Sequence, residues 1–410
     1  MATERLWNAD YCKVMAANFT LFFAFYLLTP LLPLYLSEHF HATKDVIGIV
    51  LSGYTLTALL SRPFSGYLVD TFPRKKVLLW CFFIFFIFFA GYPAATSLLL
   101  FTIIRTLHGA PFGAVTVANS TMAIDVLPST RRKEGIGYYG LSNNLAMALA
   151  PSIAIFIHHY THNFQLLFWL AFVIALAGLI ADSSLKKAES IEPTNNEQTT
   201  DDLPPMPHSA KKTRRMVSLD RFFLMRGWLL AVNMVFFGFC FGVLSNYLAI
   251  YGKEVMGITG RTGTYFAILS AGLIFSRLQG SKALREGRLV QNATEGTILS
   301  TIGYLLFVIS PNSIGYYGSA VFIGLGNGHM WPAFQNMIIS IARHNQRGTA
   351  NSTILVSWDI GMGLGVLIGG FACEFLGYTP AFWMVALAQA LGMILFVTST
   401  RPFFEARRLD

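Results

Sequence analysis

The sequence is short of charge and of cysteine. Only 12% of its 410 residues are Asp, Glu, Lys or Arg, whereas soluble domains carry about 25%. Its four cysteines include no close pair, which excludes a disulfide framework or a cysteine metal centre. Neither a nucleophile with its base nor a cluster of metal ligands is visible. We therefore expect no enzyme, no cofactor and no metal site.

Apolar residues dominate instead. They make up 54% of the chain, which includes 36 Phe, and many runs reach the roughly 20 residues that cross a bilayer core. The first run is too long for the apolar core of a signal peptide, so we expect it to remain as the first membrane helix. The net charge of +9 does not indicate nucleic-acid binding, because the basic residues lie in short loops between apolar runs.

The apolar runs predict an all-α membrane protein with twelve transmembrane helices. Prolines within several runs are compatible with this prediction, because neighbouring helices satisfy the freed backbone groups. The expected spans are 14–36, 46–69, 77–95, 98–126, 135–158, 165–182, 222–250, 263–281, 292–310, 313–342, 349–375 and 380–400.

Lys and Arg predict the orientation. Alternate loops are basic, as at 74–76 and 131–133, and the C-terminus is basic as well. The loops on the other side contain only Lys44, Lys253 and Arg261. Because cytoplasmic loops carry the excess of basic residues, we expect a multi-pass protein of the inner (cytoplasmic) membrane with both termini in the cytoplasm.

A single extended polar segment interrupts the apolar pattern. It spans residues 183–220, with an acidic first part, then Pro204, Pro205 and Pro207, and a basic end. This composition is typical of a disordered cytoplasmic linker whose basic end contacts anionic lipid headgroups. The predicted domains are therefore 1–182, an N-terminal six-helix bundle, the linker 183–220, and 221–410, a C-terminal six-helix bundle.

The two predicted bundles repeat one another. Asn18 and Asn233 lie in similar segments, and we call the spacing between them the repeat offset. The pair Gly109 and Gly113 returns at this same offset as Gly324 and Gly328. Such repetition predicts two pseudo-symmetric halves. Duplicated apolar halves are typical of secondary transporters, in which the substrate site lies between the halves near the bilayer midplane.

The loop after the second span resembles the loop signature of the major facilitator superfamily. It departs from that signature at Thr71 and Pro73, where the family has Arg and Gly. The resemblance implies a twelve-helix transporter whose cytoplasmic ends are latched in the outward-open state, with Asp125 as the acidic partner of the loop. The matching positions are Gly66, Leu68, Asp70, Arg74 and Lys75. The implied gating residues are Gly66, Asp70, Arg74 and Asp125.

The fourth span carries a second resemblance. Arg105, Gly109 and Gly113 match the Arg-x-x-x-Gly-x-x-x-Gly pattern of the family. In proton-coupled relatives the matching Arg takes part in proton exchange or binds substrate, whereas a structural Arg satisfied by carbonyls is the alternative. The fifth span only partly resembles the glycine-rich run of antiporters, since Ala150 replaces a glycine before Pro151.

Asp359 lies near mid-depth in the eleventh span, without Lys or Arg in the neighbouring turns. A desolvated carboxylate favours its protonated form, so Asp359 is a predicted proton-coupling residue. The resemblance implies that Arg105 is the other. Asp359 could equally bind a cationic group of the substrate or form a salt bridge that stabilises the bundle. Arg62 and Arg277, near helix ends, are interpreted as snorkelling or gating charges.

Polar residues within the spans are candidates for lining a substrate cavity, because buried amides in lipid face protein or a cavity. Interhelical packing bonds are the alternative for each of them. The predicted substrate-binding residues are Asn18, Asn143, Asn144, Asn233, Asn246, Tyr247, Asn327, His329, Trp331 and Gln335.

The resemblance is to the drug:proton antiporter and sugar-efflux branch of the family. It implies proton-coupled export of a small organic solute by alternating access, with protons, the solute and the lipid bilayer as partners of a monomer. A proton-coupled importer is the alternative, and a membrane enzyme or a transporter-like sensor is a third interpretation.

Overall fold

In a computed structural model, which describes residues 6–128, 131–186, 223–257, 262–342 and 347–408, every regular element is a helix. The predicted linker 183–220 lies almost wholly outside these residues. The helices of the first half are α1 (Ala9–Leu28), α2 (Leu31–Phe40), α3 (Lys44–Thr71), α4 (Arg74–Ala94), α5 (Leu98–Asp125), α6 (Arg132–Thr161) and α7 (Phe164–Ser183). Those of the second half are η3 (Met225–Gly227), α8 (Trp228–Glu254), α9 (Thr262–Arg285), α10 (Leu289–Ile309), α11 (Ser313–Ser340), α12 (Arg347–Phe375), α13 (Tyr378–Leu395), a π-helical turn η5 (Phe396–Thr400) and α14 (Arg401–Glu405).

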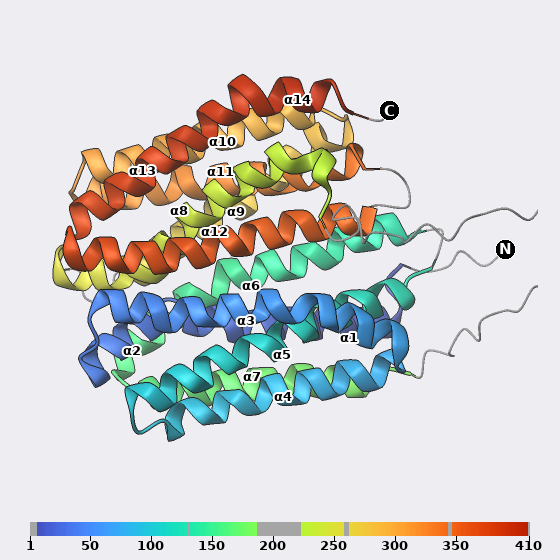
Figure 1. The fold of residues 1–410 in the computed structure, drawn as a ribbon, viewed down its shortest axis with the longest axis horizontal. Helices are drawn as coiled ribbons and strands as arrows, with labels where there is room; N and C mark the ends of the chain where they lie inside the picture. Colours follow the sequence, from blue (N-terminus) through green and yellow to red (C-terminus); the bar gives the residue numbers. More distant parts are fainter. Residues whose placement is uncertain (1–5, 129–130, 187–222, 258–261, 343–346, 409–410) are drawn as a thin grey trace, which may run out of the picture.

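The helices run along a common direction and form two groups, α1 to α7 and α8 to α14 (Figure 1). Both chain ends lie at the same end of the molecule, which we call the termini side. The other end, where α2 meets α3, is the opposite side. Because α1 and α2 form one crossing and α13, η5 and α14 form another, the two groups contain six crossings each.

The predicted spans agree with these helices. Ten crossings are long and apolar enough to span a membrane by length and composition alone. The remaining two, α9 and α11, have 24 and 28 residues and contain more small and polar side chains. The fourth span, expected at 98–126, is helix Leu98–Asp125.

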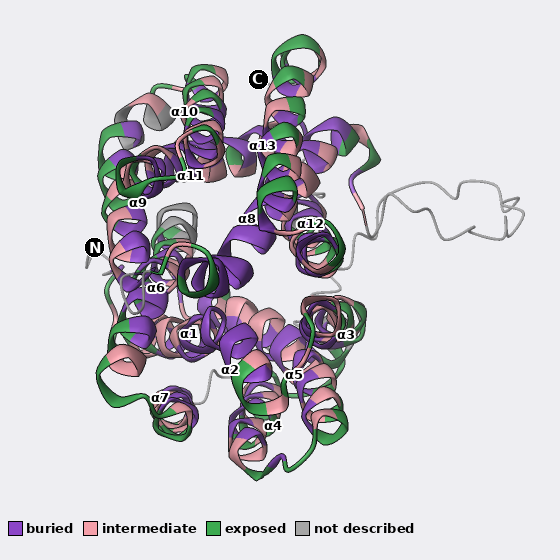
Figure 2. Cartoon of the chain, turned by 90° about the vertical axis from the view of Figure 1, so that its left-hand side faces the viewer, coloured by how far each residue is buried: buried purple, intermediate pink, exposed green. Residues whose placement is uncertain are grey.

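Large apolar side chains cover the outer faces, as expected for a surface in contact with lipid. Exposed residues lie on the outside of the bundle, whereas α8 is buried at its centre (Figure 2). The apolar runs of α4 do not face lipid uniformly: Trp80 and Phe83 are exposed, but Phe82 and Phe85 are fully buried against the rest of the first half.

The helices of the two halves repeat at the offset that relates Asn18 to Asn233. Helices α4, α5 and α6 begin at Arg74, Leu98 and Arg132. Helices α10, α11 and α12 begin at Leu289, Ser313 and Arg347, which are the positions that the repeat offset assigns to them. This agreement confirms the internal repeat and gives each residue of one half an equivalent in the other.

Packing contacts repeat at the same offset. In the first half Gly109 lies against the Tyr54 backbone and Gly113 against Ala58 and Ser61. In the second half the equivalent Gly324 lies against Leu269, and Gly328 against Leu273 and Ser276. Each contact residue in the second half is the repeat equivalent of its counterpart in the first. The glycine pairs therefore let α5 approach α3, and α11 approach α9, in the same geometry.

Gly324→Ala is expected to lower the stability of the protein, because the added Cβ would overlap the Leu269 carbonyl oxygen. Overpacking of this kind costs about 1–3 kcal/mol. The matched control is Gly140→Ala in helix α6, where a Cβ meets nothing within 4 Å. Melting temperatures of the purified proteins in detergent should fall only for Gly324→Ala, and equal values for both variants would contradict the packing.

The halves meet along two helix pairs, α3 with α12 and α6 with α9. The two pairs are equivalent at the repeat offset. Thr55 of α3 lies against Gly363 of α12. The equivalent residues of the other pair also meet, because the Ser270 hydroxyl of α9 donates to the Ala148 carbonyl of α6. Gly370 beside Gly48 likewise corresponds to Ile155 beside Gly263. Two copies of one helix interface therefore join the halves.

The buried core shows where the halves are joined. One apolar cluster includes residues of both halves and contains Tyr247 and Cys373 of the second half near the opposite side. A separate cluster, which includes Met234, Phe334 and Trp358, belongs to the second half alone. The halves thus share a core towards the opposite side.

Candidate functional site

The deepest ion pair between the halves joins Arg62 of α3 to Asp359 of α12. The Nη2 atom of Arg62 lies 2.7 Å from Oδ2 of Asp359, and both side chains are mostly buried, at 16% and 22% exposure. The expectation of an unpaired acid at Asp359 is therefore wrong. The partner lies on the other half of the molecule, where neighbouring residues in the sequence cannot indicate it. Arg62, interpreted as a snorkelling or gating charge, is a member of the site.

Among the described residues, no other contact between charged groups of the two halves lies closer to the termini side. Further towards the opposite side, the Lys44 backbone donates to Glu374, and the Lys44 ammonium lies 3.3 Å from Glu254. Lys253 is 2.7 Å from Glu38. These outer pairs are partly exposed, and each contributes little by itself. Together they close the opposite side.

Arg105 of α5 lies in an aromatic cage within the first half. Its guanidinium is 3.9 Å from the centre of the Tyr54 ring and donates a 3.0 Å hydrogen bond to the Tyr92 hydroxyl. Tyr92 in turn hydrogen-bonds His108 Nδ1 at 2.7 Å. Arg105 is 6% exposed, and its Nε has no hydrogen-bond partner. Within the described residues no carboxylate lies within 4 Å of it, so the cage stabilises the charge by cation–π contact and hydrogen bonding.

Tyr54 connects the two centres. It packs on Arg105 and belongs to α3, the helix that also carries Arg62. Its hydroxyl is buried without a hydrogen-bond partner. Arg105 of the first half and the Arg62–Asp359 pair between the halves therefore border one region near the middle of the bundle.

Six of the ten predicted substrate-binding residues form packing bonds. Asn233 is the strongest case, since its side chain is fully buried, donates to Gly392 and accepts from Thr400. Asn18 donates to Ser142, and the Tyr247 hydroxyl donates to the Val366 carbonyl. The bonds of the other three are Asn246 to Gly242, Ser300 to Asn327, and His329 to Asn292. In this conformation five of these side chains connect helices, whereas Asn246 bonds within its own helix, α8.

The other four lie on α6 and α11. Trp331 packs edge-on against Trp358 at 4.9 Å, next in sequence to Asp359. Gln335 lies one turn further along α11 and is partly exposed. On α6, Asn144 donates to the Gly140 carbonyl of its own helix, and Oδ1 of Asn143 is buried without a partner.

The gating residues are brought together in part. Arg74 at the start of α4 lies 2.5 Å from Asp125 at the end of α5, on the termini side. The side chains of Gly66 and Asp70 are not among the described ones. Arg74 and Asp125 are therefore neighbours in this conformation, and the latch role of the four residues remains a prediction.

Asp125→Asn is expected to slow transport several-fold while leaving the melting temperature nearly unchanged. The pair is partly exposed, with Arg74 at 43%, so its contribution to stability is small, whereas a latch acts on the balance between conformations. Crosslinking of cysteines introduced across the termini side would report that balance. Unchanged transport together with unchanged crosslinking would remove Asp125 from the gate.

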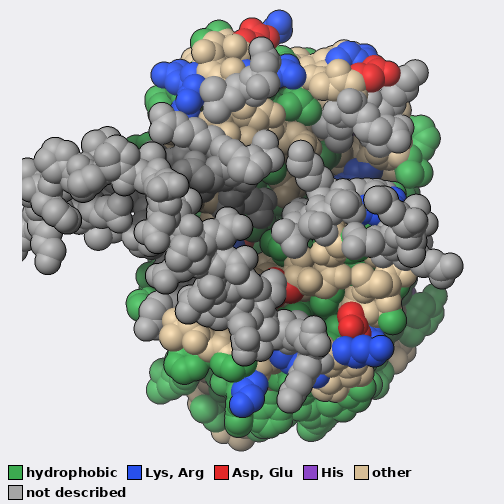
Figure 3. Space-filling model, turned by 90° about the vertical axis from the view of Figure 1, so that its right-hand side faces the viewer, with side chains coloured by type: hydrophobic (Ala, Val, Ile, Leu, Met, Phe, Trp, Pro, Cys, Tyr) green, Lys and Arg blue, Asp and Glu red, His purple; other side chains and the backbone are tan. Residues whose placement is uncertain are grey.

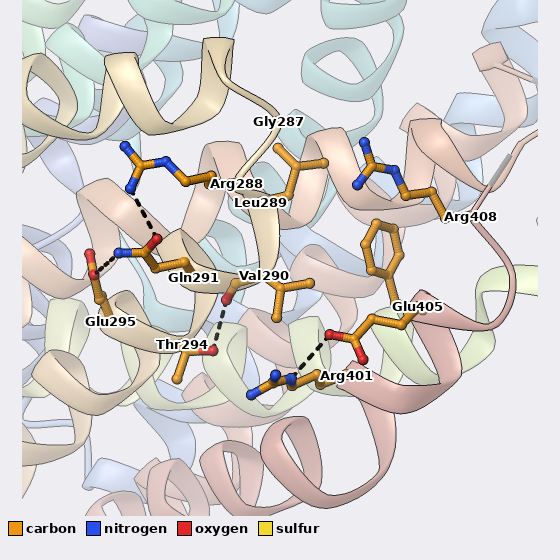
Figure 4. Close-up of a pocket in the computed structure, with 11 residues that line it drawn as sticks. Gly287, Arg288, Leu289, Val290, Gln291, Thr294, Glu295, Arg401, Glu405 and Arg408 are labelled. Carbon is orange, nitrogen blue, oxygen red and sulfur yellow. Dashed lines mark hydrogen bonds and ion pairs between the residues drawn. The ribbon is translucent and has the colours of Figure 1, made fainter. Parts of the chain in front are cut away.

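A surface pocket lies away from this region. It has a volume of about 590 Å³ between α10 and α14. Arg401 pairs with Glu405 in its lining, and Gln291 hydrogen-bonds both Arg288 and Glu295 (Figure 4). On the same termini side, Lys and Arg side chains occur on both halves (Figure 3). The pocket is separate from the region between the halves.

Sequence reasoning missed Tyr54, Tyr92 and the role of Arg62. The internal repeat could have indicated Arg62. Arg62 and Arg277 are equivalent at the repeat offset, and an arginine at the same position of both halves is more than a charge at a helix end.

Two pseudo-symmetric six-helix halves, with buried charges between and beside them, define a membrane transporter rather than an enzyme. The chain matches the family model described as Major Facilitator Superfamily over residues 14–292 and 294–408. It belongs to this superfamily and is a multi-pass membrane protein.

Among curated proteins, the chain is similar to the staphylopine export protein of Staphylococcus aureus (strain Mu50 / ATCC 700699), with 24% identity over 87% of each chain. It is also similar to the quinolone resistance protein NorA of Staphylococcus aureus (strain MRSA252), with 23% identity over 92% of this chain and 94% of that protein. Among solved structures, a bacterial homolog of the human lysosomal transporter Spinster, in an inward-facing and unoccupied conformation, has a TM-score of 0.73 at 14% identity and covers 98% of each chain. The nucleoside transporter NupG has a TM-score of 0.70 at 14% identity, over 95% of this chain and 98% of that one.

Proposed function

We propose that the protein exports a small organic solute in exchange for protons, by alternating access of a site between its halves. The observation that carries the proposal is the Arg62–Asp359 ion pair, a titratable link between two helices that belong to different halves. Charges buried in membrane proteins mark ion and substrate pathways. The aromatic and polar surroundings of Arg105 suit a partly apolar solute.

Protonation of Asp359 is the coupling step in this proposal. While Asp359 is ionised, its attraction to Arg62 holds α3 against α12. A proton on the carboxylate removes that attraction and lets the two helices separate, which favours the other conformation. Arg105 lies against Tyr54 of α3, the helix whose Arg62 pairs with Asp359, so a solute near Arg105 would respond to the protonation state.

Export is favoured over import by the names of the curated relatives, an export protein and a resistance protein. A further relative over 42% of the chain is named as a Na(+), Li(+), K(+)/H(+) antiporter, which supports exchange against protons. The distribution of basic loops supports a cytoplasmic termini side. One chain contains both halves of the site, so a monomer suffices for the cycle, with residues 1–182 and 221–410 as its domains.

Transport by membrane vesicles tests the proposal. Solutes are first selected by their effect on the melting temperature of the purified protein, starting with a fluorescent quinolone and staphylopine. Everted vesicles with an acidic lumen should then accumulate the selected solute, and nigericin, which collapses the pH gradient, should release it. Accumulation only in right-side-out vesicles with an acidic exterior would assign import, and accumulation that ignores nigericin would exclude proton coupling.

A further inference from the structure

The internal repeat gives the Arg62–Asp359 pair an equivalent on the other side of the molecule. At the repeat offset, Arg62 of α3 corresponds to Arg277 of α9, and Asp359 of α12 corresponds to Asn144 of α6. The two helix pairs share one contact register, since Thr55 beside Gly363 is matched by Ser270 beside Ala148. In this register, position 277 lies opposite position 144 as position 62 lies opposite position 359.

The charges of the two sites differ. Arg62 has a carboxylate 2.7 Å away, whereas the acid opposite Arg277 is replaced by the neutral amide of Asn144. That amide donates to the Gly140 carbonyl of its own helix. The Nε and Nη2 atoms of Arg277 are buried and have no hydrogen-bond partner. Among the described residues, no carboxylate lies within 4 Å of it.

Such a site is incomplete. A buried guanidinium without a counter-charge is costly, and the fork of its N–H groups matches the two oxygens of a carboxylate. On α6, next to Asn144 in the sequence, Oδ1 of Asn143 is likewise buried and has no hydrogen-bond partner. Unsatisfied polar groups on two facing helices, one from each half, indicate a ligand that contacts both.

We propose that Arg277 binds a carboxylate of the transported solute at the interface of α9 and α6, where the solute supplies the counter-charge that Asp359 supplies to Arg62. This inference rests on the proposed transport function and adds the chemical class of the substrate, an organic anion. A solute bound there would join α9 to α6 as the ion pair joins α3 to α12. Each of the two equivalent interfaces would then contain one link that depends on a ligand, a proton at α3 and α12 and an anion at α9 and α6.

The test uses the purified full-length protein in an uncharged detergent, at constant ionic strength, with benzoate as the probe and benzamide as its uncharged counterpart. Benzoate should raise the melting temperature of the wild-type protein in a saturable manner, and benzamide should not. Arg277→Gln should weaken benzoate binding by about tenfold or more, because it removes the positive partner of the carboxylate.

Asn144→Asp is the second variant and retains Arg277. It recreates the acid of the first interface, so its carboxylate should form an ion pair with Arg277. The melting temperature without ligand should therefore rise, and the response to benzoate should be lost. Arg288→Gln is the matched control, an exposed arginine paired with Glu286, and should respond as the wild type does.

A wild-type protein without a saturable benzoate response overturns the proposal, as does an equal response in Arg277→Gln. The measurement involves neither a membrane nor a pH gradient. A protein that binds benzoate through Arg277 but shows no proton-driven transport would therefore contradict the proposed function alone, and the reverse result would contradict this inference alone.

Discussion

Asp359→Asn is expected to abolish accumulation of solute driven by a pH gradient, while downhill exchange of solute continues. Asn has the shape of the protonated acid, so the variant resembles one state of the coupling cycle and cannot leave it. Arg62 then lacks its counter-charge, and the attraction between α3 and α12 no longer depends on pH. Paired flux measurements in proteoliposomes, with and without an imposed pH gradient, separate the two activities.

The controls for this variant address folding and charge. Glu405→Gln removes an exposed carboxylate that pairs with Arg401 at the surface, and it should transport as the wild type does. Asp359→Glu retains a titratable group and should keep part of the proton-driven accumulation. If Asp359→Asn still concentrates solute against its gradient when protons drive it, the coupling acid lies elsewhere, with His329 and His108 as the next candidates.

Arg105→Ala should abolish transport at normal expression, and Arg105→Lys should restore little of it. The guanidinium stacks on Tyr54 and donates to Tyr92 at the same time. The compact ammonium of Lys lacks the planar group that makes both contacts. Initial rates of solute exchange, normalised to the amount of protein in the membrane, measure the loss.

Tyr92→Phe separates the hydrogen bond from the cage. It retains the ring and removes only the hydroxyl, which accepts from Arg105 and also hydrogen-bonds His108 Nδ1. Hydrogen bonds to charged groups contribute roughly 1.5–3 kcal/mol, so a slowing of about tenfold or more is expected. Near-normal exchange by Arg105→Ala would show that the residue serves only the packing of the first half.

Most of the fold was predictable because a membrane constrains it strongly. Each apolar run must form a helix long enough to cross, so the fourth span, expected at 98–126, is helix Leu98–Asp125. The duplicated glycines correctly indicated two equivalent halves, since a Cβ at Gly109 or Gly324 would overlap backbone of the neighbouring helix.

The site was less predictable, because hydropathy contains no information on which helices meet. Arg62 and Asp359 are far apart in the sequence, and their pairing depends on the contact between α3 and α12. The amides show the same limit. Asn233 and Asn144 both need partners in an apolar environment, and only the packing shows that Asn233 bonds to Gly392 and Thr400, whereas Asn144 bonds within its own helix beside the interface.

Proton movement driven by the solute is the most direct measurement of coupling through Asp359. Proteoliposomes that contain a pH-sensitive dye are given a solute gradient and no pH gradient. The wild-type protein should move protons in the direction opposite to the solute, at a rate proportional to the solute flux. Asp359→Asn should move the solute with no change in internal pH. Solute flux through the wild type without proton movement, or equal proton movement in the variant, would contradict the account.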